Sequence, residues 1–158
     1  MTAPTDTRSP DGKTTKVIAT SGQLATFRLD GDLYGVEVEH VQEVLRTQQL
    51  TRVPLAPAAV AGLINLRGQV VTAIELRERL GRPPRPEGTQ AVVIVVRLHG
   101  EAVSLLVDSI ADVVDVDASD FEAPPDTLEG QARGLIRGAY KLDGQLLLAL
   151  DVQKAVGA

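Results

Sequence analysis

Gly62-Leu63-Ile64-Asn65-Leu66-Arg67-Gly68 is an apolar, strand-like run that ends in a polar residue, a cation and a glycine. A second apolar run, 69–77, follows at once, so Arg67-Gly68 stands where a tight turn would join two strands. Glycine adopts backbone angles that other residues avoid, which favours a turn at this point. The sequence therefore predicts a β-hairpin with Arg67 at its tip, an arrangement better suited to docking than to catalysis.

Alternating apolar residues predict further hairpins on both sides of this motif. Asp30-Gly31, His99-Gly100 and Asp143-Gly144 supply the turn chemistry between such runs. From Glu39 the apolar period becomes helical, which predicts a short helix after the first hairpin, and a second short helix is expected at 75–80. Many short strands and few helices predict a mainly β fold.

Three segments recur in the same order, which indicates a duplicated unit, although generic strand alternation is an alternative explanation. The matched segments are 38–44 with 107–113, Gly62-Leu63-Ile64 with Gly134-Leu135-Ile136, and 69–75 with 145–151. Each copy would form a sheet of about five short strands, and closing it into a barrel removes exposed edges. The proline-rich stretch 82–88 is the expected boundary between two β-barrels packed together, roughly 22–88 and 89–158.

The composition of the chain excludes several classes of function. The 158 residues carry a net charge of -5 and no cysteine, which excludes a disulfide scaffold and disfavours nucleic acid as a partner. Two Tyr, two Phe and no Trp leave few platforms for stacking bases or sugars. No apolar run approaches the roughly 18 residues of a spanning helix, so no membrane insertion is expected. Residues 1–21 are rich in Thr, Ser and Pro and predict a disordered tail of a cytoplasmic protein.

No arrangement of residues points to catalysis, a cofactor or a metal. His40 stands at a predicted helix start and His99 in a predicted turn, and each is expected to be solvated. The stretch 115–120 begins with the spacing of a calcium loop but has Asp120 where the sharp turn needs glycine. We therefore expect a protein that is not an enzyme.

The residues quoted above resemble the CheW family of coupling proteins in bacterial chemotaxis. The resemblance runs from about Gln23 to Val156, and its most specific part is 60–68 followed by Leu76-Arg77 and Leu80-Gly81. The segments 41–44 and 107–113 are similar to family segments in the expected order. Glu75 stands where many relatives have Asp, a better helix cap, so a looser first turn is expected there.

The resemblance implies two SH3-like, five-stranded barrels and a non-enzymatic adaptor. Such a protein bridges the cytoplasmic tip of a methyl-accepting chemoreceptor to the regulatory domain of the histidine kinase CheA. It would be monomeric alone and would work within membrane-bound receptor arrays. The residues that contact the kinase are not assigned.

Receptor contacts are implied on the predicted helix, on the hairpin and in a groove between the barrels. The positions that match are Val41, Glu43, Gly62, Leu63, Arg67 and Ile110. Glu43 and Arg67 are expected to pair, and Gly62 would allow a close approach because it has no side chain.

Three other functions compete with this one. An adaptor of another chemosensory pathway, such as twitching motility or developmental signalling, shares the same fold. A detached regulatory domain of a kinase is disfavoured because the whole unit stands alone. A small-barrel hydrolase would need a nucleophile or a metal cluster that the sequence does not offer.

Overall fold

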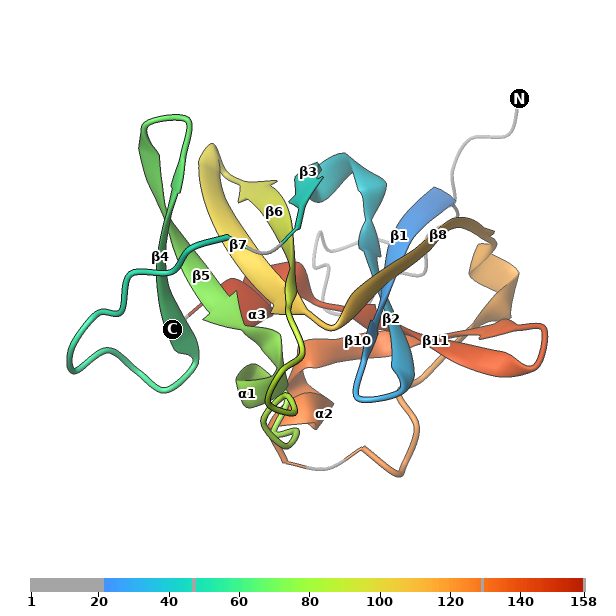
Figure 1. Ribbon diagram of the computed structural model, residues 1–158. Coiled ribbons are helices and arrows are strands. Elements are labelled where there is room, and N and C mark those ends of the chain that lie inside the picture. The colour runs from blue at the N-terminus through green and yellow to red at the C-terminus, as the bar shows by residue number, and fades with distance from the viewer. Residues whose placement is uncertain (1–21, 47, 129, 158) are drawn as a thin grey trace, which may run out of the picture.

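Two β-sheets form the body of the protein in a computed structural model that describes residues 22–46, 48–128 and 130–157. In spatial order the larger sheet consists of β8 (Ser109–Val116), β1 (Gly22–Leu29), β2 (Asp32–Glu37), β11 (Gln145–Leu150), β10 (Ile136–Leu142) and β9 (Phe121–Glu122). The smaller consists of β3 (Val41–Leu45), β6 (Val92–Leu98), β7 (Glu101–Val107), β5 (Gln69–Glu75) and β4 (Val60–Leu66). Figure 1 shows the two sheets side by side. The expected tail, residues 1–21, lies outside the described residues.

Short helical segments connect the strands. They are η1 (Val38–His40), α1 (Leu76–Arg79), η2 (Ala118–Asp120), α2 (Gln131–Leu135) and α3 (Val152–Val156). The fold is therefore mainly β, with five-stranded and six-stranded sheets and a few short helices, which confirms the predicted fold class.

Tight turns close the hairpins where the sequence predicts them. Asp30, Arg67 and His99 have φ of 51°, 51° and 49°, and the glycine after each has φ between 83° and 88°. Two successive residues with positive φ match the right-handed twist of the flanking strands. The fourth predicted turn joins β10 to β11, and its glycine, Gly144, has φ of 80°.

The two sheets share one strand order, as a duplication predicts. Strands β8, β1, β2, β11 and β10 of the larger sheet correspond to β3, β6, β7, β5 and β4 of the smaller. In both sheets the pair at the centre is parallel, β2 with β11 and β5 with β7, while the other pairs are antiparallel.

The sheets do not divide the chain at the predicted boundary near residue 88. Hairpin β1–β2 joins the sheet of β10–β11, and hairpin β6–β7 joins the sheet of β4–β5. In each sheet, a parallel strand pair holds the hairpin that comes from the other repeat. Gly35 of β2 lies opposite Ala149 of β11, and Ala73 of β5 lies opposite Ser104 of β7. The linker 82–88 separates the two sequence repeats. It does not determine which sheet the next hairpin joins, because both sheets offer the same kind of edge.

One of the three sequence matches is out of register. Aligning the turn glycines Gly68 and Gly144 makes Gly62 equivalent to Gly138, four residues beyond the Gly134 of the sequence match. Both β4 and β10 shift register at this glycine. Gly134 lies instead in α2, so the strand predicted from 134 begins only at 136.

The predicted helix from Glu39 is wrong. Only Val38–His40 forms a helical turn, and Val41–Leu45 is the strand β3, paired with β6. Helical spacing of three apolar residues is weak evidence, and pairing with a neighbouring strand overrides it. The second predicted helix is confirmed as α1, where the Glu75 carboxylate accepts a hydrogen bond from the Arg77 backbone N–H at 3.2 Å and caps the helix.

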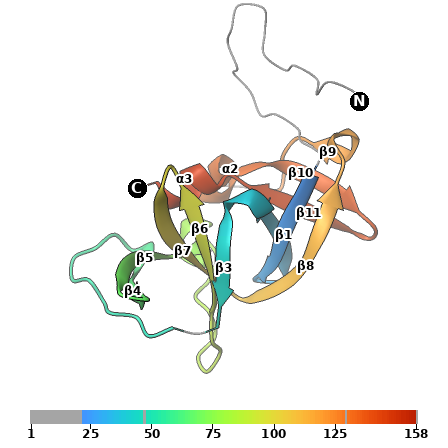
Figure 2. The same cartoon turned by 90° about the horizontal axis from the view of Figure 1, so that it is seen from above.

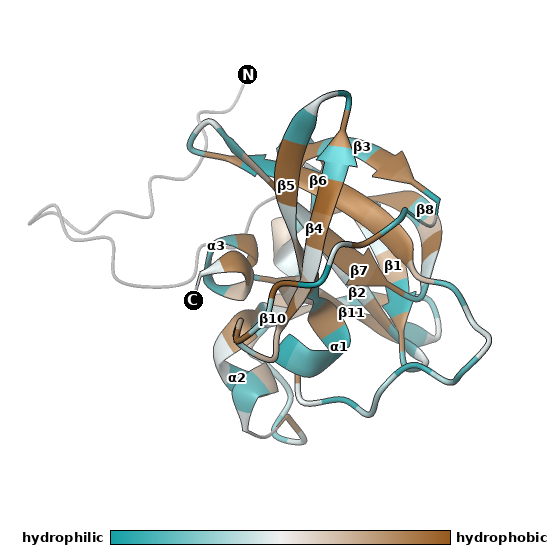
Figure 3. Cartoon of the chain, turned by 60° about the vertical axis from the view of Figure 1, so that its left-hand side comes forward, coloured by the Kyte–Doolittle hydropathy of each residue, from teal (hydrophilic) through white to brown (hydrophobic). Residues whose placement is uncertain are grey.

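Buried apolar residues form three clusters. The largest lies between the sheets and the helices, and a smaller one lies within each sheet. Strand β6 contributes to two of them, since Ile94 and Val96 join the shared core while Val93 and Val95 join the cluster of their own sheet. This explains why 91–98 is apolar on both faces. In Figure 3 the hydrophobic colour follows the strands, and hydrophilic residues gather at turns and connections.

Candidate functional site

The tip of hairpin β4–β5 presents Arg67 on a rigid turn. Leu66 pairs with Gln69 across the hairpin, and the Asn65 side-chain oxygen accepts a hydrogen bond from the Gly68 backbone N–H at 2.9 Å. These bonds fix the backbone on both sides of Arg67. The predicted turn with Arg67 at its tip is confirmed.

Arg67 forms a bidentate ion pair with Glu43, as the sequence analysis expected. Its Nη1 lies 2.8 Å from Oε2 of Glu43, and its Nη2 lies 2.9 Å from Oε1. The Arg67 side chain is 77% exposed and that of Glu43 is 18% exposed. Such a pair contributes about 0–1 kcal/mol to folding. Its larger effect is to hold the guanidinium in one orientation between the edge strands β3 and β4.

A bulge separates Glu43 from Val41. Val41 pairs with Val96 and Glu43 pairs with Val95, so one extra residue lies between them on β3. Val41 consequently packs against the shared core, whereas Glu43 faces the hairpin tip. The structure therefore does not place Val41 with Glu43 on one exposed face.

Gly62 and Leu63 contact the chain's own loop. A Cβ on Gly62 would lie 2.5 Å from the backbone oxygen of Thr51. The Thr51 and Leu63 backbones exchange hydrogen bonds of 2.9 Å and 2.8 Å. The close approach that Gly62 allows is thus an approach of this loop, and Leu63 is only half-buried beside it.

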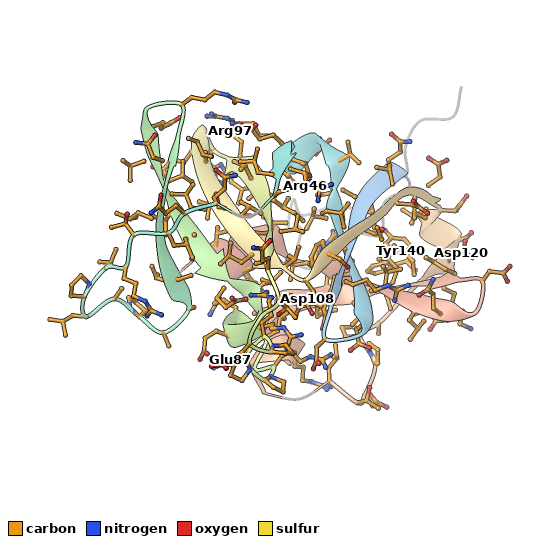
Figure 4. The ribbon with its side chains drawn as sticks, viewed as in Figure 1. Arg46, Glu87, Arg97, Asp108, Asp120 and Tyr140 are labelled. Atoms are coloured by element: carbon orange, nitrogen blue, oxygen red, sulfur yellow. The ribbon has the colours of Figure 1, made fainter. Side chains whose placement is uncertain are left out.

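An apolar groove of about 380 Å³ lies between β3 and β8, which are edge strands of the two sheets. It is lined by Val44, Leu45, Arg46, Val92 and Ile110. Val44 and Ile110 are 46% and 42% exposed. Figure 2 shows β3 and β8 on the same side of the molecule, and Figure 4 labels Arg46, the residue directly after β3.

The groove brings together one predicted site residue and several that the sequence did not indicate. Ile110 lines it, while Val41 and Leu63 do not. Val44 was missed because a helical spacing assigns it to a buried face, whereas strand alternation turns it away from Glu43. Val92 was missed because only the pairing of β6 with β3 carries it to this place.

A second charged cluster surrounds Asp108, at the junction of β7 and β8. Arg77 donates to its carboxylate from Nε at 2.9 Å and from Nη2 at 2.6 Å, and the Asp30 backbone N–H donates at 2.8 Å. Burial opposes ionisation of Asp108, but these bonds and one from Arg85 outweigh it and hold its pKa at about 2. The same pairing raises the pKa of Arg77, whose side chain is only 7% exposed.

The linker 82–88 is tied to this cluster. Arg85 donates to Asp108 at 3.1 Å and reaches both carboxylate oxygens of Glu75 at 2.8 Å and 3.1 Å. Arg82 pairs with Asp32 and donates to the hydroxyl of Tyr34. Figure 4 places Asp108 near the middle of the molecule, above the loop that carries Glu87. In the sequence, only the presence of charged residues beside apolar runs pointed to this cluster.

Comparison with known proteins gives a family. Residues 23–158 match the family described as the CheW-like domain. The chain belongs to the CheW-like domain family. It is 30% identical over 137 residues to the chemotaxis protein CheW of Bacillus subtilis, covering 87% of this chain and 88% of that one. The corresponding protein of Rhizobium meliloti is 30% identical over 130 residues, covering 82% and 84%.

A solved structure shares the fold of this CheW-like chain. It is the crystal structure of the scaffolding protein TtCheW from Thermoanaerobacter tengcongensis, with a TM-score of 0.74 and 27% identity. The match covers 83% of this chain and 89% of that one. Within the part of the chain that the structure describes, no helix has the length and apolar character to cross a membrane.

Proposed function

We propose that this protein is a non-enzymatic chemotaxis adaptor that couples methyl-accepting chemoreceptors to the histidine kinase CheA. The observation that carries the proposal is family membership over residues 23–158, together with curated relatives named as chemotaxis proteins that align along most of both chains. The protein would work at the cytoplasmic face of membrane-bound receptor arrays.

The receptor tip, a helical hairpin in the family, would lie along the β3–β8 groove. Val44 and Ile110 are exposed enough to bury apolar residues of a helix, which is helix-in-groove recognition. Arg67 keeps 77% of its side chain exposed while Glu43 orients it, so it can still meet a partner. Charges at such a rim set the orientation of a partner more than its affinity.

The remaining predicted contact residues would support this surface from behind. Val41 anchors β3 to the shared core, and Gly62 and Leu63 hold the 51–63 loop against β4. In this proposal they position Glu43 and Arg67 and do not touch the receptor. The surface that binds CheA is not assigned to residues.

A CheW-like adaptor of another chemosensory pathway is the second candidate. A relative with a different name, Protein PilI of Pseudomonas aeruginosa, is 28% identical over 116 residues. That match covers 72% of this chain and 64% of the other protein, less than the matches to the chemotaxis proteins. Chemotaxis is therefore favoured.

Co-sedimentation with a receptor cytoplasmic fragment, with and without CheA, tests the proposal. We expect the wild-type chain to sediment with both partners and Arg67→Ala to lose the receptor. The melting temperature of Arg67→Ala should fall by no more than about 2–4 °C, since an exposed pair contributes about 0–1 kcal/mol. Asp143→Ala, at the equivalent tip of the other hairpin, is the matched control and should still sediment.

Two results would count against the proposal. Failure of the wild-type chain to bind either partner contradicts the coupling function itself. A much larger fall in melting temperature for Arg67→Ala makes the arginine a structural brace. A double-mutant cycle on Glu43 and Arg67 separates these roles, because strictly additive losses in receptor binding would show that the pair does not act as a unit.

A further inference from the structure

Both histidines of the chain line the same cavity. The cavity measures about 390 Å³ and lies between η1, the β6–β7 turn and the start of α3. His40 and Glu37 form one side of its lining, while His99 and Asp151 come from distant parts of the sequence. Sequence spacing could not show this, because β3, hairpin β4–β5, α1 and β6 lie between the two histidines.

Three side chains that can bind a metal meet where β2 ends and η1 begins. One nitrogen or carboxylate oxygen from each of Glu37, Glu39 and His40 lies within 4.8 Å of the others. His40 Nε2 is already 3.1 Å from Oε1 of Glu37. Ligands around a tetrahedral zinc ion are about 3.3 Å apart, given metal–ligand bonds of about 2.0–2.2 Å. Glu39 is exposed and the other two are partly exposed, so a small rotation of these side chains would bring all three onto one ion.

The other repeat provides an independent reason to expect a cation here. The residue equivalent to Glu39 is Asp108, whose carboxylate is neutralised by the guanidinium of Arg77. The residue equivalent to Arg77 is Gln153, which is uncharged and contacts His99 at 2.7 Å. The repeat that lacks the arginine thus keeps the carboxylate.

The repeat that contains Glu39 also has two possible metal ligands that the other repeat lacks. Glu37 stands where the other repeat has the buried Leu106, and His40 stands where it has Ser109. Two arginines, Arg97 and Arg137, also line the cavity, and the guanidinium of Arg97 donates to Gln42 at 2.8 Å and to the Gly100 carbonyl at 2.7 Å. Where one repeat has the guanidinium of Arg77, the other therefore has two additional groups that can bind a cation, Glu37 and His40.

We propose that Glu37, Glu39 and His40 bind a divalent transition-metal ion of the zinc class. An imidazole and two carboxylates suit Zn²⁺ better than Mg²⁺, which prefers oxygen ligands and retains its waters. The cavity that Glu37 and His40 line leaves room for a water as the fourth ligand. A metal here would fix the turn that leads into β3, and the proposal does not depend on the adaptor function.

Titration of the full-length chain with Zn²⁺ in a calorimeter tests the site. We expect one ion per chain, and binding at least about tenfold weaker in His40→Ala and in Glu39→Gln, because each removes a direct ligand. His99→Ala is the matched control and should bind as the wild type does. The chain has two histidines and no cysteine, so few other groups compete for the ion.

NMR of the histidine side chains gives a second readout that requires no substitution. Zinc should shift the ring nitrogens of His40 and leave those of His99 near their metal-free positions. Absence of stoichiometric binding would overturn the proposal, as would unchanged affinity in His40→Ala. Equal loss in His99→Ala and His40→Ala would also overturn it, because the ion would then lie across the cavity with a different set of ligands.

Discussion

The surroundings of Asp108 and of Glu39 share a backbone arrangement and differ in charge. Both residues follow the second strand of a hairpin, Glu39 after β2 and Asp108 after β7. At Asp108 two arginines and a backbone N–H surround the carboxylate, and the linker 82–88 packs over them. In the repeat of Glu39 the residue equivalent to Arg77 is Gln153, which contacts His99, and both line a cavity together with His40.

The hairpin tips differ in the same way. Arg67 on β4–β5 is equivalent to Asp143 on β10–β11, and its partner Glu43 is equivalent to Asp112. Two acids cannot form the ion pair that one arginine and one acid form. The duplicated backbone therefore carries two different surfaces, which shows that the charges of a few turn and strand-end residues, not the fold, distinguish the two halves.

The largest expected loss of stability comes from replacing Arg77, whose equivalent in the other half is the uncharged Gln153. Arg77→Leu leaves Asp108 in a partly buried site with Arg85 as its remaining cation, so we expect a loss of about 3 kcal/mol in the free energy of unfolding. Gln153→Leu, the matched change in the other half, should stay within about 0.5 kcal/mol. Urea unfolding measures both. Equal losses would show that the two places are energetically alike.

A second test concerns what the halves share. Gly62→Ala and Gly138→Ala each place a Cβ 2.5 Å from a backbone oxygen, of Thr51 and of Glu122 respectively. Each should cost about 1–3 kcal/mol by crowding. Gly134→Ala is the control, since a Cβ there meets nothing within 4 Å and α2 favours alanine over glycine. If Gly138→Ala is neutral while Gly62→Ala is costly, the bulges are not equivalent.

The smallest expected effect is a loss of stability at acidic pH. The pKa of Asp108 is lowered from 3.8 to about 2 in the folded chain, so folding favours its ionised form. Its contribution, at most about 2 kcal/mol, is complete above pH 4 and is lost as the pH falls toward 2. Unfolding measured at several pH values should show this loss in the wild type and not in Asp108→Asn. An identical pH dependence in the variant would assign the acid sensitivity to other groups.

Much of the fold could be predicted because its signals are local. A residue with positive φ followed by glycine closes a hairpin whatever surrounds it, so the turns at Asp30, Arg67 and His99 were found. The Glu43–Arg67 pair was also expected, although from the family resemblance. The wrong prediction at 39–45 shows the limit, because a five-residue apolar pattern fits either a helix or a strand.

The rest of the site depended on contacts between distant segments. Val44 and Ile110 meet only because each lies on the edge strand of a different sheet. Arg77 and Asp108 meet because hairpin β6–β7 crosses to the sheet of β5. No spacing along the chain records that crossing, since either sheet could have accepted the hairpin.

By itself the sequence determined the hairpins, their turns, the mainly β class and the arginine at one tip, because these follow from steric preferences of neighbouring residues. Only the tertiary structure decided which hairpin entered which sheet, and with it the groove, the charge cluster at Asp108 and the cavity shared by His40 and His99. Such features depend on strand pairing and burial across the whole chain. Pairing a hairpin with one sheet or the other looks equivalent from neighbouring residues, but the two arrangements differ in the free energy of the folded chain.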